Sequence, residues 1–280
     1  MPVDWYNGGM EHTTLHLLYS RFIFKFLWDI GAVPEAVGQE PYQKRTSHGM
    51  VLGERGIKMS KSKGNVINPD AVVRQYGADT LRVYEMFMGP FDQMIPWNTK
   101  GVVGARRFLE KIYNLCEKRG AATASDEKLK KHLHKAIKKV GDDIELMKFN
   151  TAVSCLMEFA NAWQVSKGSL DKKDLAELLK LLSPFAPHLA EELWLSAGFK
   201  NLCCAQKWPK YNPKMIEEEK ILLIVQINGK IRDKIEVDSG INQKEAEKLV
   251  LKSEKIKKLT EGREIKKIVF VPNKLVNIVI

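Results

Sequence analysis

In the first 98 residues, the spacing of apolar positions changes every few residues, which is typical of short helices and strands joined by loops. Leu15, Tyr19, Phe22, Phe26 and Leu27 recur at helical spacing, and a glycine at position 31 is the predicted helix stop. The predicted elements are a β-like stretch at 3–9, a helix over 11–31, a buried strand at 49–53, a loop over 54–70, a helix from about 71 capped by Asp70, and a helix over 78–89 that ends at Gly89-Pro90. This segment is therefore predicted to be of the α/β type.

From about Thr99 the pattern becomes one of long, lysine-rich amphipathic segments with apolar residues at i, i+3, i+4 and i+7. Pro184 and Pro187 are expected to break the last of them. The predicted helices cover 101–120, 128–147, 151–168 and 174–198, and a linker rich in proline and charge covers 207–220. Helices joined by short connections predict a helical bundle.

The last 60 residues change period again. Two strand-like runs flank Asn228-Gly229, a strong hairpin signal, within 221–237. A helix is predicted over 243–262, followed by β-like runs at 265–272 and 274–280. The predicted fold is an α/β segment (1–98), a helical bundle (99–212) and a small α+β domain (213–280).

The net charge of +11 is unevenly distributed. Residues 1–98 carry 10 basic and 10 acidic side chains, residues 99–219 carry 21 and 16, and residues 220–280 carry 14 and 8. The whole surplus therefore lies after residue 98. A solvated lysine-rich surface explains it, and so does a surface that binds a polyanion by neutralising phosphates.

The composition excludes some classes of protein. No apolar run is long enough to span a membrane, and the first residues lack the order of a signal peptide, so a cytoplasmic protein is expected. The cysteines at 116, 155, 203 and 204 form no C-x-x-C pair and have no histidine at zinc-ligand spacing, so reduced thiols and no metal site are expected.

The most distinctive motif is the run K-M-S-K-S-K-G-N at positions 58–65, on a predicted loop before a helix. Serine hydroxyls and backbone N–H groups can bind phosphate oxygens, lysines supply point charges, and glycine permits the loop to move. A solvated basic loop is the alternative for such a run standing alone.

This run resembles the KMSKS signature of class I aminoacyl-tRNA synthetases. The resemblance implies ATP, as its Mg²⁺ complex, and an amino acid whose carboxylate displaces pyrophosphate from the α-phosphorus. Cations aimed at the departing phosphates lower that barrier. Lys58 and Lys61 are then the candidate catalytic residues. The ATP-binding set is Lys58, Met59, Ser60, Lys61 and Ser62, with Met59 expected to anchor the loop by packing.

A second block narrows the resemblance to leucyl-tRNA synthetases: Gly8-Gly9-Met10-Glu11-His12, then His16-Leu17-Leu18-Tyr19 and Arg21-Phe22. It implies that Gly9 and Glu11 complete the ATP site, with Glu11 accepting hydrogen bonds from the ribose. His12 and His16, four apart on one predicted helix face, would border the pocket for L-leucine and its adenylate. Two structural histidines are the main alternative, and a zinc pair is disfavoured because no third ligand accompanies them.

Further blocks resemble the same family in order. They are the F-M-G-P run at 87–90, F-N-T-A at 149–152, P-F-A-P-H at 184–188, V-Q-I-N-G-K at 225–230 and the closing V-P-N-K-L-V-N-I-V at 271–279. The resemblance implies that the bundle and the tail bind tRNA(Leu), with Lys230, Arg232 and Lys274 as candidate contacts.

The sequence also departs from the family, because no His-x-Gly-His (HIGH) motif and no editing domain are present. We therefore expect catalysis to require a complementary HIGH-containing amino-terminal segment or subunit, without which residues 1–98 are poorly stable and expose apolar surface. A split subunit, a truncated gene product and an artificial fragment all fit. The alternative function is a non-catalytic tRNA-binding or interaction protein derived from a synthetase.

Overall fold

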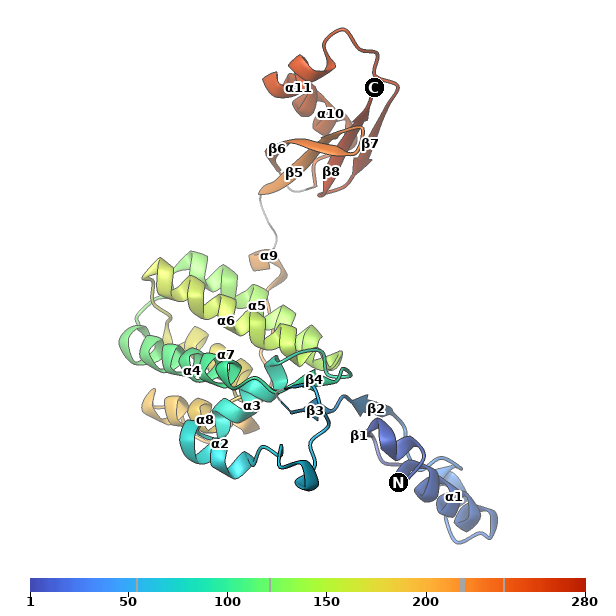
Figure 1. Cartoon of the computed structure of the whole chain (residues 1–280). Coiled ribbons are helices and arrows are strands. Elements are labelled where there is room, and N and C mark those ends of the chain that lie inside the picture. Colours follow the sequence, from blue (N-terminus) through green and yellow to red (C-terminus); the bar gives the residue numbers. More distant parts are fainter. Residues whose placement is uncertain (54, 121, 217–219, 239) are drawn as a thin grey trace. The chain divides into compact units, whose positions relative to one another are not determined.

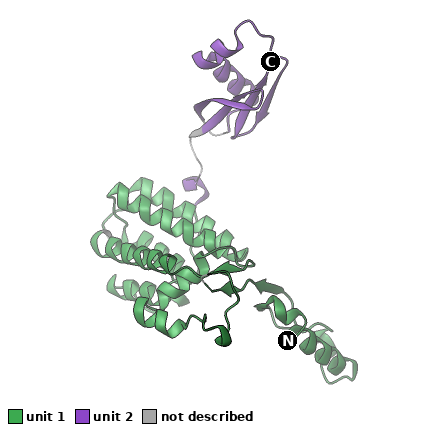
Figure 2. Cartoon of the chain, viewed as in Figure 1, with its two compact units in different colours: residues 1–211 green, residues 212–280 purple. Residues whose placement is uncertain are grey.

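The computed structural model describes residues 1–53, 55–120, 122–216, 220–238 and 240–280, in two compact units that cover 1–211 and 212–280 (Figures 1 and 2). The elements of the first unit are β1 (Tyr6–Gly9), α1 (His16–Asp29), β2 (Arg45–His48), β3 (Val51–Leu52), α2 (Pro69–Tyr76), α3 (Ala78–Phe87), β4 (Ile95–Pro96), α4 (Thr99–Arg119), α5 (Glu127–Glu145), α6 (Phe149–Ser166), α7 (Lys172–Leu182) and α8 (Pro187–Ser196). The second unit contains α9 (Pro213–Ile216), β5 (Lys220–Ile227), β6 (Lys230–Asp238), α10 (Gln243–Lys252), α11 (Glu254–Thr260), β7 (Lys267–Val271) and β8 (Leu275–Val279). The predicted order of an α/β segment, a helical bundle and a small α+β domain is confirmed.

The α/β segment contains two short parallel strand pairs, β1 with β2 and β3 with β4. The expectation of a buried strand at 49–53 is wrong, because β3 has two residues and Val51 is 36% exposed. A parallel strand is normally covered on both faces, and within the described residues β3 has β4 as its partner in a two-stranded sheet.

The predicted helix over 11–31 is also wrong at its start. Residues Met10–Thr13 form a 3₁₀ turn, and α1 begins only at His16. Leu15, the residue before the helix, has φ −116° and ψ −111°, which is not helical. His12 therefore lies in the 3₁₀ turn, whereas His16 is the first residue of α1.

The helix after the loop begins earlier than predicted. Pro69 occupies the first turn of α2, and the side-chain oxygen of Asn68 accepts the backbone N–H of Asp70. Asn68, not Asp70, is thus the cap, since proline has the fixed φ of a first helical residue and the capping side chain precedes it.

The core of the first unit lies in the helical bundle. Side chains of α2 and α3, including Val72, Val83 and Tyr84, belong to the same buried cluster as Leu133 of α5 and Trp163 of α6. The helices that follow the loop are therefore packed into the bundle. Pro184 and Pro187 separate α7 from α8, as predicted.

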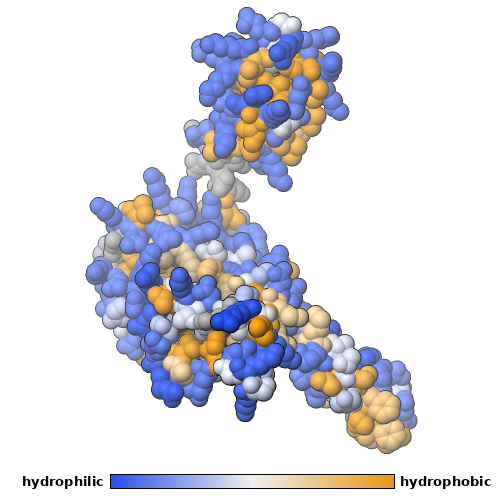
Figure 3. All heavy atoms as spheres, viewed as in Figure 1, coloured by the Kyte–Doolittle hydropathy of each residue, from blue (hydrophilic) through white to orange (hydrophobic). Residues whose placement is uncertain are grey.

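Apolar surface gathers on α1 instead (Figure 3). Among its described residues only Phe24 is buried, whereas Phe22 is 70% exposed. The exposed apolar side chains at and beside this helix are Leu15, Leu18, Tyr19, Phe22, Ile23, Phe26 and Ile30. A helix of this composition normally buries one face.

In the second unit a four-stranded sheet in the order β6-β5-β8-β7 packs against α10 and α11. The hairpin prediction is confirmed: Ile227 pairs with Lys230, and Asn228 and Gly229 have φ of 48° and 76° in a two-residue turn. The single predicted helix over 243–262 is wrong, because Ser253 is extended (ψ 126°) and separates α10 from α11.

No helix among the described residues has the length and apolar character needed to cross a membrane. The four cysteines are free thiols. Within the described ranges no three histidine, cysteine or acidic side chains gather as a metal site would require.

Candidate functional site

The K-M-S-K-S-K-G-N segment leaves β3 through a tight turn and returns to α2. Gly53 N–H donates to the carbonyl of Ile57 at 2.8 Å, and Lys58 forms an isolated antiparallel β-bridge with Leu52 of β3. Met59 and Ile67, one on each arm of the loop, pack against the core of the first unit. Both arms are therefore anchored by apolar contacts.

The tip between these anchors, residues 61–64, is exposed. Lys61–Lys63 form a 3₁₀ turn that ends at Gly64, which has φ 61° and ψ 17°. The hydroxyls of Ser60 and Ser62 lie 3.1 Å apart. A left-handed residue at this point reverses the chain, and glycine adopts that conformation without steric cost.

The three lysines of the loop carry uncompensated charge. Lys58, Lys61 and Lys63 are exposed, and within the described residues none has a carboxylate at ion-pair distance. A loop that bears three free ammonium groups and two hydroxyls is suited to phosphate oxygens.

The glycine and histidine block forms a second cluster. A Cβ on Gly9 would lie 2.3 Å from a carboxylate oxygen of Glu11, so a larger residue where β1 meets the 3₁₀ turn would displace the end of that side chain. His16 Nδ1 lies 3.0 Å from the Tyr6 hydroxyl, and the two rings stack with centroids 5.7 Å apart.

His12 differs from its neighbour. Its ring lies edge-on to that of His16 at 6.4 Å between centroids, although the two residues do not share a helix. The Nδ1 atom of His12 is buried and has no hydrogen-bond partner among the described residues. A buried polar atom without a partner is costly and is common at sites that receive a ligand.

Gly9, Glu11, His12 and His16 thus lie in one cluster and Lys58 to Ser62 in another. In the part of the chain that the structure describes, no hydrogen bond or ion pair joins the two.

The candidate tRNA contacts of the second unit are spread along its sheet. Lys230 begins β6 opposite Ile227, which also pairs with Ile278 near the carboxyl end of β8. Lys274 precedes β8 at its amino end, where its carbonyl accepts Ile224 N–H at 3.0 Å. Arg232 lies in β6 where the register shifts by one residue. Lys230 and Lys274 therefore lie near opposite ends of the β5–β8 pairing.

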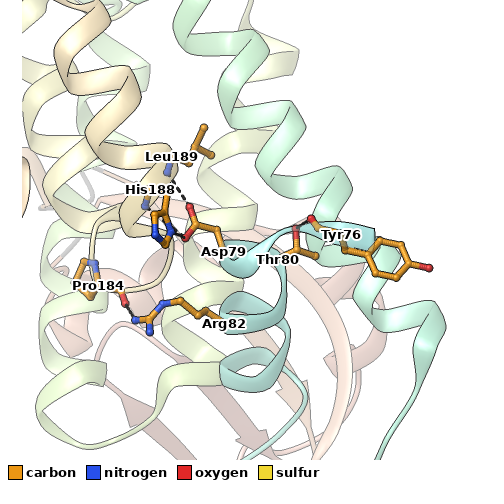
Figure 4. Close-up of polar contacts among 7 residues, drawn as sticks. All are labelled: Tyr76, Asp79, Thr80, Arg82, Pro184, His188 and Leu189. Atoms are coloured by element: carbon orange, nitrogen blue, oxygen red, sulfur yellow. Dashed lines mark hydrogen bonds and ion pairs between the residues drawn. The ribbon is translucent and has the colours of Figure 1, made fainter. Parts of the chain in front are cut away.

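A polar connection between α3 and α8 was not foreseen from the sequence (Figure 4). The Asp79 carboxylate accepts hydrogen bonds from the N–H groups of His188 (3.4 Å) and Leu189 (2.7 Å), and its Oδ1 lies 2.8 Å from His188 Nδ1. Arg82 Nη2 donates to the carbonyl of Pro184 at 2.8 Å. Asp79 thus caps a helix that lies 109 residues later, and an acidic residue in a first turn gives no sequence signal for this.

Comparisons with known proteins match both the segment that contains the K-M-S-K-S-K-G-N loop and the helical bundle that follows it. Residues 23–96 match the family described as "tRNA synthetases class I (I, L, M and V)", and residues 126–249 match "Anticodon-binding domain of tRNA ligase". A leucine–tRNA ligase of Alkaliphilus oremlandii (strain OhILAs) is 47% identical over all 280 residues, which span 34% of that protein.

Solved structures show the same likeness. The leucyl-tRNA synthetase AgnB2 of Agrobacterium radiobacter K84, in a ternary complex with tRNA and LeuAMS, matches the whole chain with a TM-score of 0.86 and 34% identity, over 38% of its own length. A methionyl-tRNA synthetase of Mycobacterium tuberculosis with methionyl-adenylate shares the fold over 69% of this chain and 43% of its own, at 19% identity and a TM-score of 0.50.

The chain spans about a third of the length of the leucyl enzymes that it matches. It corresponds, in sequence and fold, to the carboxy-terminal portion of leucyl-tRNA synthetases: a class I catalytic segment followed by an anticodon-binding domain.

Proposed function

We propose that this chain supplies the KMSKS half of a leucine–tRNA ligase active site and binds tRNA(Leu) for aminoacylation. The observation that carries the proposal is the anchored loop with three exposed lysines, at positions 58, 61 and 63, that form no ion pair with any residue the structure describes. Its substrates are L-leucine and ATP, the latter as its Mg²⁺ complex.

In this function Lys58 and Lys61 meet the β- and γ-phosphates as pyrophosphate departs, where fixed cations stabilise the developing charge. Ser60 and Ser62 offer hydroxyls to the same oxygens, and Met59 holds the loop by packing. Gly9 and Glu11 contact the nucleotide, with Glu11 accepting hydrogen bonds from the ribose. His12 and His16 border the leucyl-adenylate. The buried Nδ1 of His12, which has no hydrogen-bond partner in the described part of the chain, supports its role at a pocket wall.

The three segments divide this work. We assign residues 1–98 to the catalytic site, 99–212 to the anticodon-binding-type bundle and 213–280 to tRNA contact through Lys230, Arg232 and Lys274. The basic surplus after residue 98 supports the last two assignments.

Catalysis requires a complementary HIGH-containing segment or subunit. Two features support this: the sequence holds no His-x-Gly-His, and α1 exposes a row of apolar side chains that includes Phe22 and Phe26. A class I catalytic domain that is complete would cover such a face. Adding the HIGH-containing half of a related enzyme should reduce the fluorescence of an apolar dye bound to this chain, whereas unchanged dye binding contradicts the assignment.

The proposal is tested by leucine-dependent ATP–pyrophosphate exchange, measured with this chain alone and with a supplied HIGH-containing half. Exchange in the mixture but not in either part supports the proposal. Absence of exchange in both, with salt-sensitive tRNA binding retained, supports the second candidate, a non-catalytic tRNA-binding protein, which the basic surplus after residue 98 favours.

A further inference from the structure

The K-M-S-K-S-K-G-N loop has an anchored base and an exposed tip, and the side chain of Asn65 lies between them. Residues 61–64 are exposed, whereas Asn65 is half-buried. Met59 and Ile67 hold the base by apolar packing, which fixes no direction for the polar backbone of the tip. The geometry of the tip must therefore come from hydrogen bonds.

Asn65 makes two of these bonds, both across the loop. Its Oδ1 accepts the backbone N–H of Ser60 at 2.9 Å, and its Nδ2 donates to the backbone carbonyl of Lys58 at 3.3 Å. One amide side chain on the returning arm thus bonds two polar backbone groups of the outgoing arm.

Two glycines make room for this arrangement. Gly64 has the left-handed conformation that turns the chain so that the next residue faces back across the loop. A Cβ on Gly53 would lie 3.2 Å from Asn65 Nδ2, which is tighter than an ordinary contact. The amide of Asn65 therefore occupies space that a larger residue at position 53 would compete for.

The contacts also explain why the residue is asparagine. The position needs one acceptor for an N–H and one donor for a carbonyl on a short side chain. Aspartate supplies the acceptor alone when ionised, and alanine supplies neither.

We propose that Asn65 is a positioning residue for the KMSKS loop, holding Lys58 and Ser60 so that Lys61 is presented to the phosphates of ATP. This inference rests on the proposed function of the loop. Asn65 acts through the backbone of the lysine-bearing arm, so that the charges are oriented before the reaction begins.

The variants that test it are Asn65→Ala, which removes both bonds, and Asn65→Asp, which keeps the acceptor for Ser60. Asn114→Ala is the matched control, because Asn114 Nδ2 donates to a backbone carbonyl, that of Glu110, on the exposed surface of α4. Asn65 lines a cavity of about 610 Å³, so truncation should leave the fold intact.

The first measurement is amide hydrogen exchange at Ser60 in the 280-residue chain, followed by two-dimensional NMR. A single net hydrogen bond corresponds to a factor of about five to ten in exchange. We expect that acceleration in Asn65→Ala, with slow exchange retained in Asn65→Asp and in the control. Unchanged exchange in Asn65→Ala would overturn the inference regardless of any activity.

The second measurement is ATP–pyrophosphate exchange in the mixture with a HIGH-containing half. We expect kcat to fall about tenfold in Asn65→Ala with KM for leucine unchanged, because the loop acts on the phosphates. If the wild-type mixture is active and the Asn65→Ala mixture has the same kcat, the positioning role is excluded and the proposed function stands. If the wild-type mixture shows no ATP–pyrophosphate exchange, the proposed function is excluded, and the role of Asn65 in it is excluded as well.

Discussion

Arg21 of α1 binds Glu40 through two nitrogens, with Nε 2.9 Å from Oε2 and Nη2 2.6 Å from Oε1. Lys25 Nζ lies 2.9 Å from the same carboxylate. These contacts join α1 to the segment that precedes β2, and the hydrogen bonds from Arg21, then Lys25, lower the pKa of Glu40 to about 2.

The pH dependence of this contact follows from the sign of that shift. A lowered pKa in the folded state means that the contact stabilises the fold above the unfolded pKa and is lost as the pH falls through about 2. Carboxyl ¹³C NMR should give Glu40 a midpoint near that value, and Arg21→Ala should move it toward 4.5, with a smaller change in Lys25→Ala. A wild-type midpoint near 4.5 would show that the contact does not form. Both side chains are nearly half exposed, so the effect on unfolding should be small.

Replacing Lys61 with alanine tests the chemistry assigned to the loop. In an enzyme completed with a HIGH-containing half, activation should slow by about 10²–10³-fold, comparable to the loss of one oxyanion donor. tRNA binding should barely change. Lys118→Ala, which removes an exposed lysine of α4, is the control. An unaltered activation rate in Lys61→Ala would exclude the role.

The tRNA contacts assigned to the second unit predict a salt dependence. Alanine at Lys230, Arg232 or Lys274 should each reduce the slope of log K against log salt by about 1, because one phosphate contact is lost. Lys230 lies beside one end of the β5–β8 pairing and Lys274 at the other end, so their effects should add. Lys248→Ala on α10 should leave the slope unchanged, and an equal reduction there would mean that the contacts are not specific.

The connection between α3 and α8 predicts a stability effect. Asp79→Ala leaves the first N–H groups of α8 without their acceptor, which should lower the free energy of unfolding by about 1–2 kcal/mol. Urea denaturation of the whole chain measures it, with the exposed Asp92→Ala as control. Equal midpoints for the two variants would contradict the capping role.

The thiols should differ in reactivity. Burial raises the pKa of Cys116 and Cys203 to about 12 and that of Cys155 to about 11, so their thiolate populations are small at neutral pH. Cys204 is exposed, although its hydrogen bond to Glu191 raises its pKa too. A disulfide reagent at pH 8 should modify Cys204 slowly and first, and the others only after denaturation. Equal rates for all four would refute this order.

Much of the fold could be predicted where one local signal decides the structure. Asn228-Gly229 determined the hairpin because both residues accept positive φ, and Pro184 and Pro187 ended one helix and began the next. The failure at 243–262 has a tertiary cause. Ser253 Oγ donates to Asp233 of β6 at 2.8 Å, and no helical pattern contains that contact.

The candidate site was predictable only in part. The motif residues are recognisable because their types suit phosphates, but whether they meet each other depends on spatial arrangement. The sequence identifies Asn65 as the last residue of the K-M-S-K-S-K-G-N motif, but it does not predict the hydrogen bonds of Asn65 to Ser60 and Lys58. The 3₁₀ turn before α1 was missed because residues 11–15 contain no proline or glycine to mark a break in the helix.

The cap that Asp79 provides sets a rule for recombining such proteins. A chimaera that exchanges the bundle at the start of α4, the apparent seam, would separate α8 from the acceptor of its first N–H groups. A crossover placed before α2 would transfer the helix and its cap together. The crossover point that keeps this contact therefore lies before α2, upstream of the boundary at α4 that the helix pattern suggests.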